Sequence, residues 1–179
     1  TNTRSDACRR YRRAQLCKKV KPMTMPTMQQ ALKLYEETMR KRCAESSRFE
    51  LGRSKGERIH AAMVAVAAQM IASRLPEIDG EKAYIMGLFH DFGKLVYNDE
   101  MSDKFHGLEG YKYLRKLGYD ELARISLTHT FYEQELNLKE YAGYNPSEMR
   151  KCKKLLQEVP FDDYDRLIQL GDRLSVGVT

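Results

Sequence analysis

Residues 57–75 read ERIHAAMVAVAAQMIASRL, an almost wholly apolar and alanine-rich stretch that is followed by Pro76. A helix that is apolar on nearly every side is buried in the core of its protein. Proline has no N–H group and clashes with the preceding turn, so it ends a helix of this kind. The stretch therefore predicts a buried helix that stops at Pro76.

The segments on both sides of this stretch also have helical patterns. Thr27-Met28-Gln29-Gln30 has the form of a capping box, and apolar residues recur at helical spacing behind it, which predicts a helix over residues 28–47. Next, Gly52 and Gly56 predict a basic loop that contains Arg53, Ser54 and Lys55. Further helices are predicted over residues 81–91 (broken at Gly93), 106–117, 121–129 with Asp120 as its cap, 146–158 and 163–175. Since no segment alternates with a period of two, the expected fold is an all-α single bundle of about six or seven helices.

The positive charge is concentrated at the start of the chain. Residues 1–22 carry eight basic side chains and one acid, a net +7 that leaves −1 for residues 23–179 of a 179-residue chain with a net charge of +6. We therefore predict a basic N-terminal extension, residues 1–24, ahead of one helical domain, residues 25–179. Contact of the extension with nucleic acid is not favoured, because no aromatic stacking platform accompanies the charge. A solvated extension, or a helix packed through Tyr11, Leu16 and Val20, is the preferred interpretation.

Several classes of protein are excluded by what the sequence lacks. No apolar run approaches the length of a membrane span, and the first ten residues, TNTRSDACRR, contain no apolar core of a signal peptide. Four widely spaced cysteines without a C-x-x-C motif are typical of reduced thiols, which predicts a cytoplasmic protein. The chain contains no P-loop, G-x-G-x-x-G or H-E-x-x-H motif, so no motif supports assigning it to the kinases, the Rossmann-fold proteins or the zincin proteases. Glu57-x-x-His60 has the E-x-x-H form of ferritin-like di-iron bundles, but no second copy is present.

The histidines carry the chemical information. There are four of them: His60, His90, His106 and His129. Taken alone, His60 inside its apolar helix is best explained as a hydrogen-bonded core histidine. His90 is different, because Asp91 follows it at the end of a second apolar helix. A buried imidazole beside a buried acid is costly unless a cation compensates them, and a divalent metal would do so.

Asp172 is a second acid in an apolar context. Its neighbours Leu167, Ile168, Leu170 and Leu174 predict the apolar face of the last helix. The alternative is a surface acid that pairs with Arg166 or Arg173. The residues by themselves leave both interpretations open.

Together these residues resemble a known family. The ordered set His60, His90-Asp91 and Asp172 is similar to the H…HD…D pattern of the HD-domain superfamily of metal-dependent phosphohydrolases. HDFGK at residues 90–94 resembles the HDIGK form of the doublet, and His106 and His129 match the two additional histidines of the dinuclear-metal branch. The resemblance spans about residues 57–175.

The resemblance implies a helical bundle that holds one or two divalent transition-metal ions. By analogy, one ion is bound by His60, His90, Asp91 and Asp172, and Asp91 bridges to a second that His106 and His129 complete. Imidazole and carboxylate ligands suit Fe or Mn best, with Zn, Co or Mg as alternatives. Asp91 and Lys94 are the expected catalytic residues, and Lys94, Arg53 and Arg58 are expected to contact the phosphate of the substrate.

The expected function is hydrolysis of a small phosphorylated substrate, a nucleotide or another phosphate ester, by a metal-activated water. Two alternatives stay open. The first is a di-iron oxygenase, a branch of the same superfamily with much the same ligands. The second is a non-catalytic signalling or binding module that contains metal.

Overall fold

The computed structural model describes residues 25–45, 51–96, 106–131, 136 and 145–176, with the backbone alone described for residues 45 and 51–55. The predicted N-terminal extension, with Tyr11, Leu16 and Val20, lies outside these residues. Residues 97–105, 132–135 and 137–144 lie outside them too. The statements below concern the described residues.

Eight helices and no strands occur in the part of the chain that the structure describes, which confirms the all-α prediction. They are α2 (Met28–Glu45), α3 (Leu51–Ala72), α4 (Gly80–Phe89), α5 (Gly93–Val96), α6 (His106–Leu117), α7 (Asp120–Thr128), α8 (Pro146–Glu158) and α9 (Asp163–Ser175). The predicted bounds of α6, α8 and α9 agree with those observed. The eighth helix is the four-residue α5, which the sequence pattern did not predict.

Two local predictions at glycines were wrong. Arg53, Ser54 and Lys55 do not form a loop, because α3 begins at Leu51 and runs through Gly52 and Gly56 without a break. A glycine inside a helix costs only about 1 kcal/mol, and the long buried segment that follows outweighs this. Likewise Gly93 begins α5 instead of breaking a helix, and the chain turns at residues 90–92.

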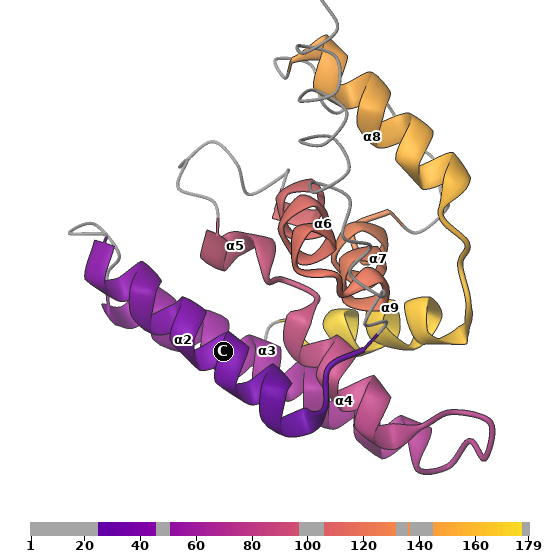
Figure 1. Cartoon of the computed structure of the whole chain (residues 1–179). Coiled ribbons are helices and arrows are strands. Elements are labelled where there is room, and N and C mark those ends of the chain that lie inside the picture. The colour runs from indigo at the N-terminus through magenta and orange to yellow at the C-terminus, as the bar shows by residue number, and fades with distance from the viewer. Residues whose placement is uncertain (1–24, 46–50, 97–105, 132–135, 137–144, 177–179) are drawn as a thin grey trace, which may run out of the picture.

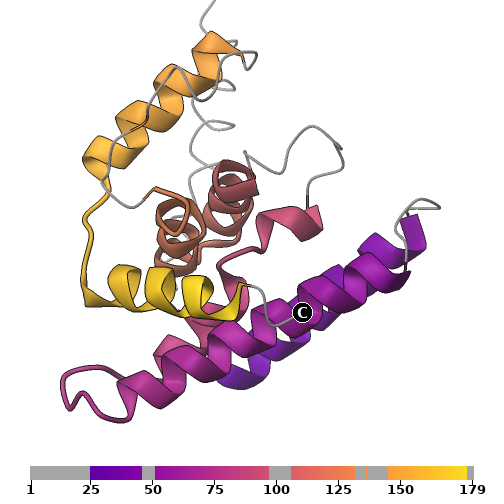
Figure 2. The same ribbon diagram turned by 180° about the vertical axis from the view of Figure 1, so that it is seen from behind.

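The helices pack around two apolar clusters. The main core joins α2, α3, α4, α7 and α9, and includes Val64, Phe89 and Ile168. A smaller cluster, with Leu127, Cys152 and Leu156, attaches α8 to α6 and α7. Figure 1 and Figure 2 accordingly show α6 and α7 in the middle of the molecule, between α8 on one side and α2 and α3 on the other. No described helix is long and apolar enough to cross a membrane.

Aromatic side chains hold the turn between α4 and α5 in place. The rings of Phe89 and Phe92 are fully buried and stack with centroids 4.7 Å apart, and Tyr35 of α2 packs edge-on against Phe89 at 5.8 Å. Such contacts give a turn a defined geometry beyond their apolar burial. Because Phe89 and Phe92 occupy the core, the two residues between them, His90 and Asp91, are left to face the neighbouring helices.

Side-chain caps define where two further helices begin. The carboxylate of Asp162 accepts hydrogen bonds from the N–H groups of Tyr164 and Asp165 and so caps α9. Asn145 caps α8 with Pro146 at its first turn, as the sequence predicted. The Asp162 cap thus sets the start of the helix that carries Asp172.

Candidate metal centre

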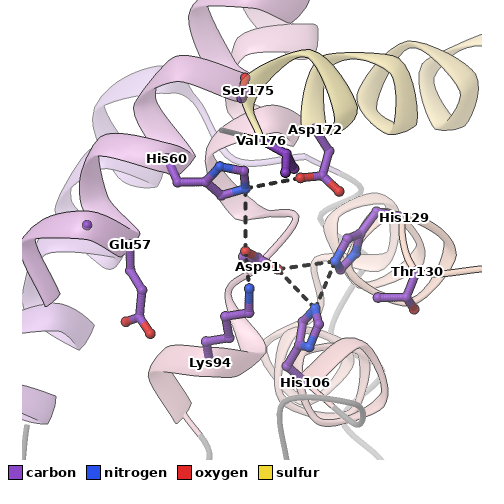
Figure 3. A pocket seen from close by; sticks show the side chains of 11 residues that line it. Glu57, His60, Asp91, Lys94, His106, His129, Thr130, Asp172, Ser175 and Val176 are labelled. Carbon is purple, nitrogen blue, oxygen red and sulfur yellow. Dashed lines mark hydrogen bonds and ion pairs between the residues drawn. The ribbon is translucent and has the colours of Figure 1, made fainter. Parts of the chain in front are cut away.

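The six predicted ligands come from different helices and converge at one place. His60 lies in the middle of α3, His90 follows the end of α4, and Asp91 lies in the turn after it. His106 is the first residue of α6, His129 follows the end of α7, and Asp172 lies in α9. Figure 3 shows the side chains of His60, His106 and His129 around Asp91, with Asp172 beside His60. Residues distant in sequence thus form one cluster.

The two carboxylate oxygens of Asp91 face two separate groups of histidines. Oδ2 lies 3.7 Å from Nε2 of His60 and 3.4 Å from Nε2 of His90. Oδ1 lies 2.9 Å from Nε2 of His106 and 3.2 Å from Nε2 of His129. In each group the three ligand atoms lie within 4.8 Å of one another, so each group can hold one metal ion. Asp91 belongs to both.

Asp172 joins the first group. Its Oδ1 lies 3.0 Å from Nε2 of His60 and 3.7 Å from Nε2 of His90. The predicted apolar face around it was only half right, because Leu170 and Leu174 are 48% and 59% exposed. The period of 3.6 residues instead places Ile168 and Ser175 on the buried side, and Asp172 lies at its edge.

The contacts of Nδ1 in His90 and His129 indicate that Nε2 of each ring faces the cluster. Nδ1 of His90 lies 2.7 Å from the carbonyl oxygen of Gly87, and Nδ1 of His129 lies 3.2 Å from that of Ile125. A carbonyl only accepts, so in both rings Nδ1 donates. The Nε2 atom of each neutral ring then directs a lone pair toward the carboxylate of Asp91. Lone pairs that face a carboxylate repel it unless a proton or a metal ion lies between them, so this donor set fits a divalent metal.

The surroundings keep Asp91 ionised and shift the pKa values of His90 and His129 in opposite directions. Burial alone would raise the pKa of Asp91, but His90, His106 and His129 hold it well below its ordinary value. Burial lowers the pKa of His129 to about 4. Burial also lowers the pKa of His90, yet Asp91 and Asp172 outweigh it, so that this pKa is raised above 6.5. In the metal-free protein a proton on His90 therefore offsets part of the negative charge.

We expect the affinity of the metal-free protein for Mn²⁺ or Co²⁺ to fall as the pH is lowered from about 8 to about 6. A metal ion binds only neutral imidazole, and the raised pKa of His90 means that its proton competes with the metal near neutral pH. Titration calorimetry in buffers of different ionisation enthalpy should detect protons released on binding. An affinity that stays constant over this range would contradict the assignment of His90 as a ligand.

A cavity of about 580 Å³ opens onto the cluster. Its lining includes all of the predicted ligands except His90, together with Gly56, Glu57, Lys94, Thr130, Ser175 and Val176. Sequence reasoning did not predict that Glu57, Thr130 and Ser175 line a cavity. The signal was available for two of them, since Glu57 and Ser175 lie three residues from His60 and Asp172, on the same helix faces.

The predicted basic residues are placed differently from one another. Nζ of Lys94 lies 2.6 Å from Oδ2 of Asp91, and Lys94 lines the cavity. Arg58 is exposed and does not line the cavity, so its contact with substrate stays a prediction. The side chain of Arg53, in the first turns of α3, lies outside the described residues.

Comparison with known proteins gave a family match over the segment that contains the six converging residues. The family model described as "HD domain" matches residues 58–177, which is more than half of the chain and contains all six converging residues. Neither the comparison with curated proteins nor the comparison with solved structures gave a match. A helical domain, a buried His/Asp cluster that can hold metal ions, and the family match lead to one conclusion: the chain belongs to the HD domain family.

Proposed function

We propose that this protein is a metal-dependent phosphohydrolase with a dinuclear centre, and that it hydrolyses a nucleotide or another phosphate ester. The observation that carries the proposal is the placement of Asp91, whose two oxygens face two separate groups of histidines. A carboxylate that faces two ligand groups is suited to bridge two ions. A structural metal site rarely needs two ions with open positions.

In this proposal five of the six residues each bind one ion, and Asp91 binds both. His60, His90, Asp91 and Asp172 hold the first, and Asp91, His106 and His129 hold the second. Two such ions, with Fe or Mn preferred and Zn, Co or Mg as alternatives, would supply a water of lowered pKa and a clamp on the phosphoryl group. The described part of the chain provides three ligands for the second ion, and both histidines among them line the cavity, so substrate has access to that side.

Lys94 supplies positive charge at the cavity wall. Its ammonium group pairs with Asp91 at the cavity wall, where its positive charge can attract a phosphoryl oxygen. It therefore neutralises charge on the bound ester while the carboxylate of Asp91 stays ionised. Glu57, on the same wall, adds negative charge that favours retention of cations in the cavity.

We expect Lys94→Ala to lower kcat for phosphate ester hydrolysis by roughly 100-fold, the usual cost of removing one group that stabilises transition-state charge. Metal content should not change, because Lys94 is not a ligand. The matched control is Lys112→Ala. Lys112 pairs with Glu109 at the same 2.6 Å and the same spacing of three residues, but lies outside the cavity. Loss of metal from the Lys94 variant, or unchanged turnover, would show that Lys94 has another role.

The proposal is tested by metal analysis followed by assays of the purified chain with Mn²⁺ or Fe²⁺. We expect bound metal, hydrolysis of a generic phosphodiester and turnover of at least one nucleotide in a panel. A mixed-valent di-iron signal with oxygen consumption would favour the oxygenase instead. Bound metal with neither reaction would favour a binding module. A protein that binds no metal and is inert would overturn the proposal.

A further inference from the structure

We propose that three buried side chains, Thr128, Asp165 and Gln169, form a clasp between α7 and α9 that positions His129 against Asp172. The inference rests on the proposed metal centre, because it concerns how two of its ligands are brought into register. The clasp residues lie outside the lining of the cavity and are positioning residues rather than ligands.

The clasp fixes the residue that immediately precedes His129. The hydroxyl of Thr128 donates to Oδ1 of Asp165, and Nε2 of Gln169 donates to the carbonyl oxygen of Thr128 at 2.9 Å. The hydroxyl also lies 3.0 Å from the carbonyl of Arg124, but a carboxylate is the stronger acceptor for its one hydrogen. Both the side chain and the main chain of Thr128 are therefore held by α9.

The same face of α9 carries the clasp and the ligand. Asp165, Gln169 and Asp172 follow one another at spacings of four and three residues, so they lie along one side of the helix. A rotation or slide of α9 that broke the two bonds to Thr128 would also move Asp172 away from His60. One set of contacts thus controls the distance between a ligand of the first group and a ligand of the second.

A buried charge network completes the clasp. Asp165 is fully buried, and its Oδ2 accepts from Nη1 of Arg124 and from the N–H of Asp162 at 2.7 Å. Nη2 of Arg124 lies 2.8 Å from a carboxylate oxygen of Asp162, the residue that caps α9. Burial raises the pKa of Asp165 to about 6, while its contacts with Thr128 and Arg124 favour the ionised form.

The role of this network is better explained as fixing the relative position of α7 and α9 than as raising the free energy of unfolding. A buried ion pair often adds no stability over apolar residues of the same volume, but its directed bonds specify one arrangement. α9 packs mainly on α3, and its contact with α7 is smaller. The polar clasp therefore supplies the register between α7 and α9 that a small apolar contact would leave loose.

The experiment uses Co²⁺ as the probe, because its visible absorption reports ligand geometry without any enzymatic assay. Thr128→Val removes the hydroxyl at nearly constant shape. We expect it to weaken Co²⁺ binding by about 10-fold, as the loss of a partner behind the ligands commonly does, and to change the absorption of bound Co²⁺. Thr128→Ser retains the hydroxyl and should restore both. Gln169→Met removes the other bond and should act in the same direction, which keeps the test decisive if Thr128→Val fails to fold.

Ser126→Ala is the matched control. Ser126 is also fully buried on α7, two residues before Thr128, but its hydroxyl has no partner among the described residues. Its loss should leave Co²⁺ binding unchanged. Wild-type affinity and absorption in Thr128→Val and Gln169→Met would overturn the clasp, even if both variants unfold at a lower temperature. A wild-type protein that binds no Co²⁺ would overturn the proposed metal centre and the clasp with it.

Discussion

Asp91→Ala is expected to abolish metal binding at both sites together with hydrolysis. Among the described residues, Asp91 is the one whose oxygens face both groups, so its removal takes a ligand from each. The affinity should fall by more than the 10–100-fold that is typical for a partner behind the ligands, so we expect a loss of at least about 100-fold. Metal content after dialysis and turnover at saturating substrate are the measurements.

Two further variants separate the two sites, and a third is their control. In Asp91→Asn the carboxamide has one oxygen and one NH₂ group, so it can accept on one side only, and we expect one ion to be retained. His129→Ala should lose the second ion and keep the first. Asp163→Asn, on the exposed side of α9, should change neither. Two ions bound with wild-type affinity by Asp91→Ala would disprove the bridging role.

Gly93→Ala is expected to destabilise the protein by about 3 kcal/mol or more, the upper range for overpacking, because the clash is with backbone. A Cβ at residue 93 would lie 1.7 Å from the carbonyl oxygen of His106 and 2.9 Å from the N–H nitrogen of Gly110. Neither atom can rotate away, so α6 must move as a whole. Since α6 begins at His106, the variant should also lose the second metal ion before the first.

Urea unfolding and metal analysis of the same samples test this prediction. Gly56→Ala is the matched control, because nothing lies within 4 Å of a Cβ at that position. Gly56 lies inside α3, where alanine is favoured over glycine by up to about 1 kcal/mol, so this variant should be as stable as the wild type or slightly more stable. Equal urea midpoints for Gly93→Ala and Gly56→Ala would contradict the close approach of the backbone of α6 to Gly93.

Where the determinants are local, the sequence was sufficient. Apolar periodicity and capping residues predicted α6, α8 and α9 with their observed bounds, because spacing and caps act within a few residues. Errors arose at Gly52, Gly56 and Gly93, where packing outweighed a weak local preference of glycine, and at Leu170 and Leu174, which are exposed. The resemblance to the HD-domain superfamily, which rests on the ordered histidines and aspartates, also predicted which residues gather at the site.

The sequence by itself therefore determined an all-α chain and, through its resemblance to a known family, the membership of the cluster. Only the tertiary structure decided that the oxygens of Asp91 face opposite groups, that Glu57 and Ser175 line the cavity while Arg58 does not, and that Thr128 is held by α9. The physical reason is that these relations depend on how closely and in which register helices pack. The contact of Gly93 with His106 and the hydrogen bonds of Asp165 join residues distant in the chain. The periodicity of the sequence does not predict such contacts.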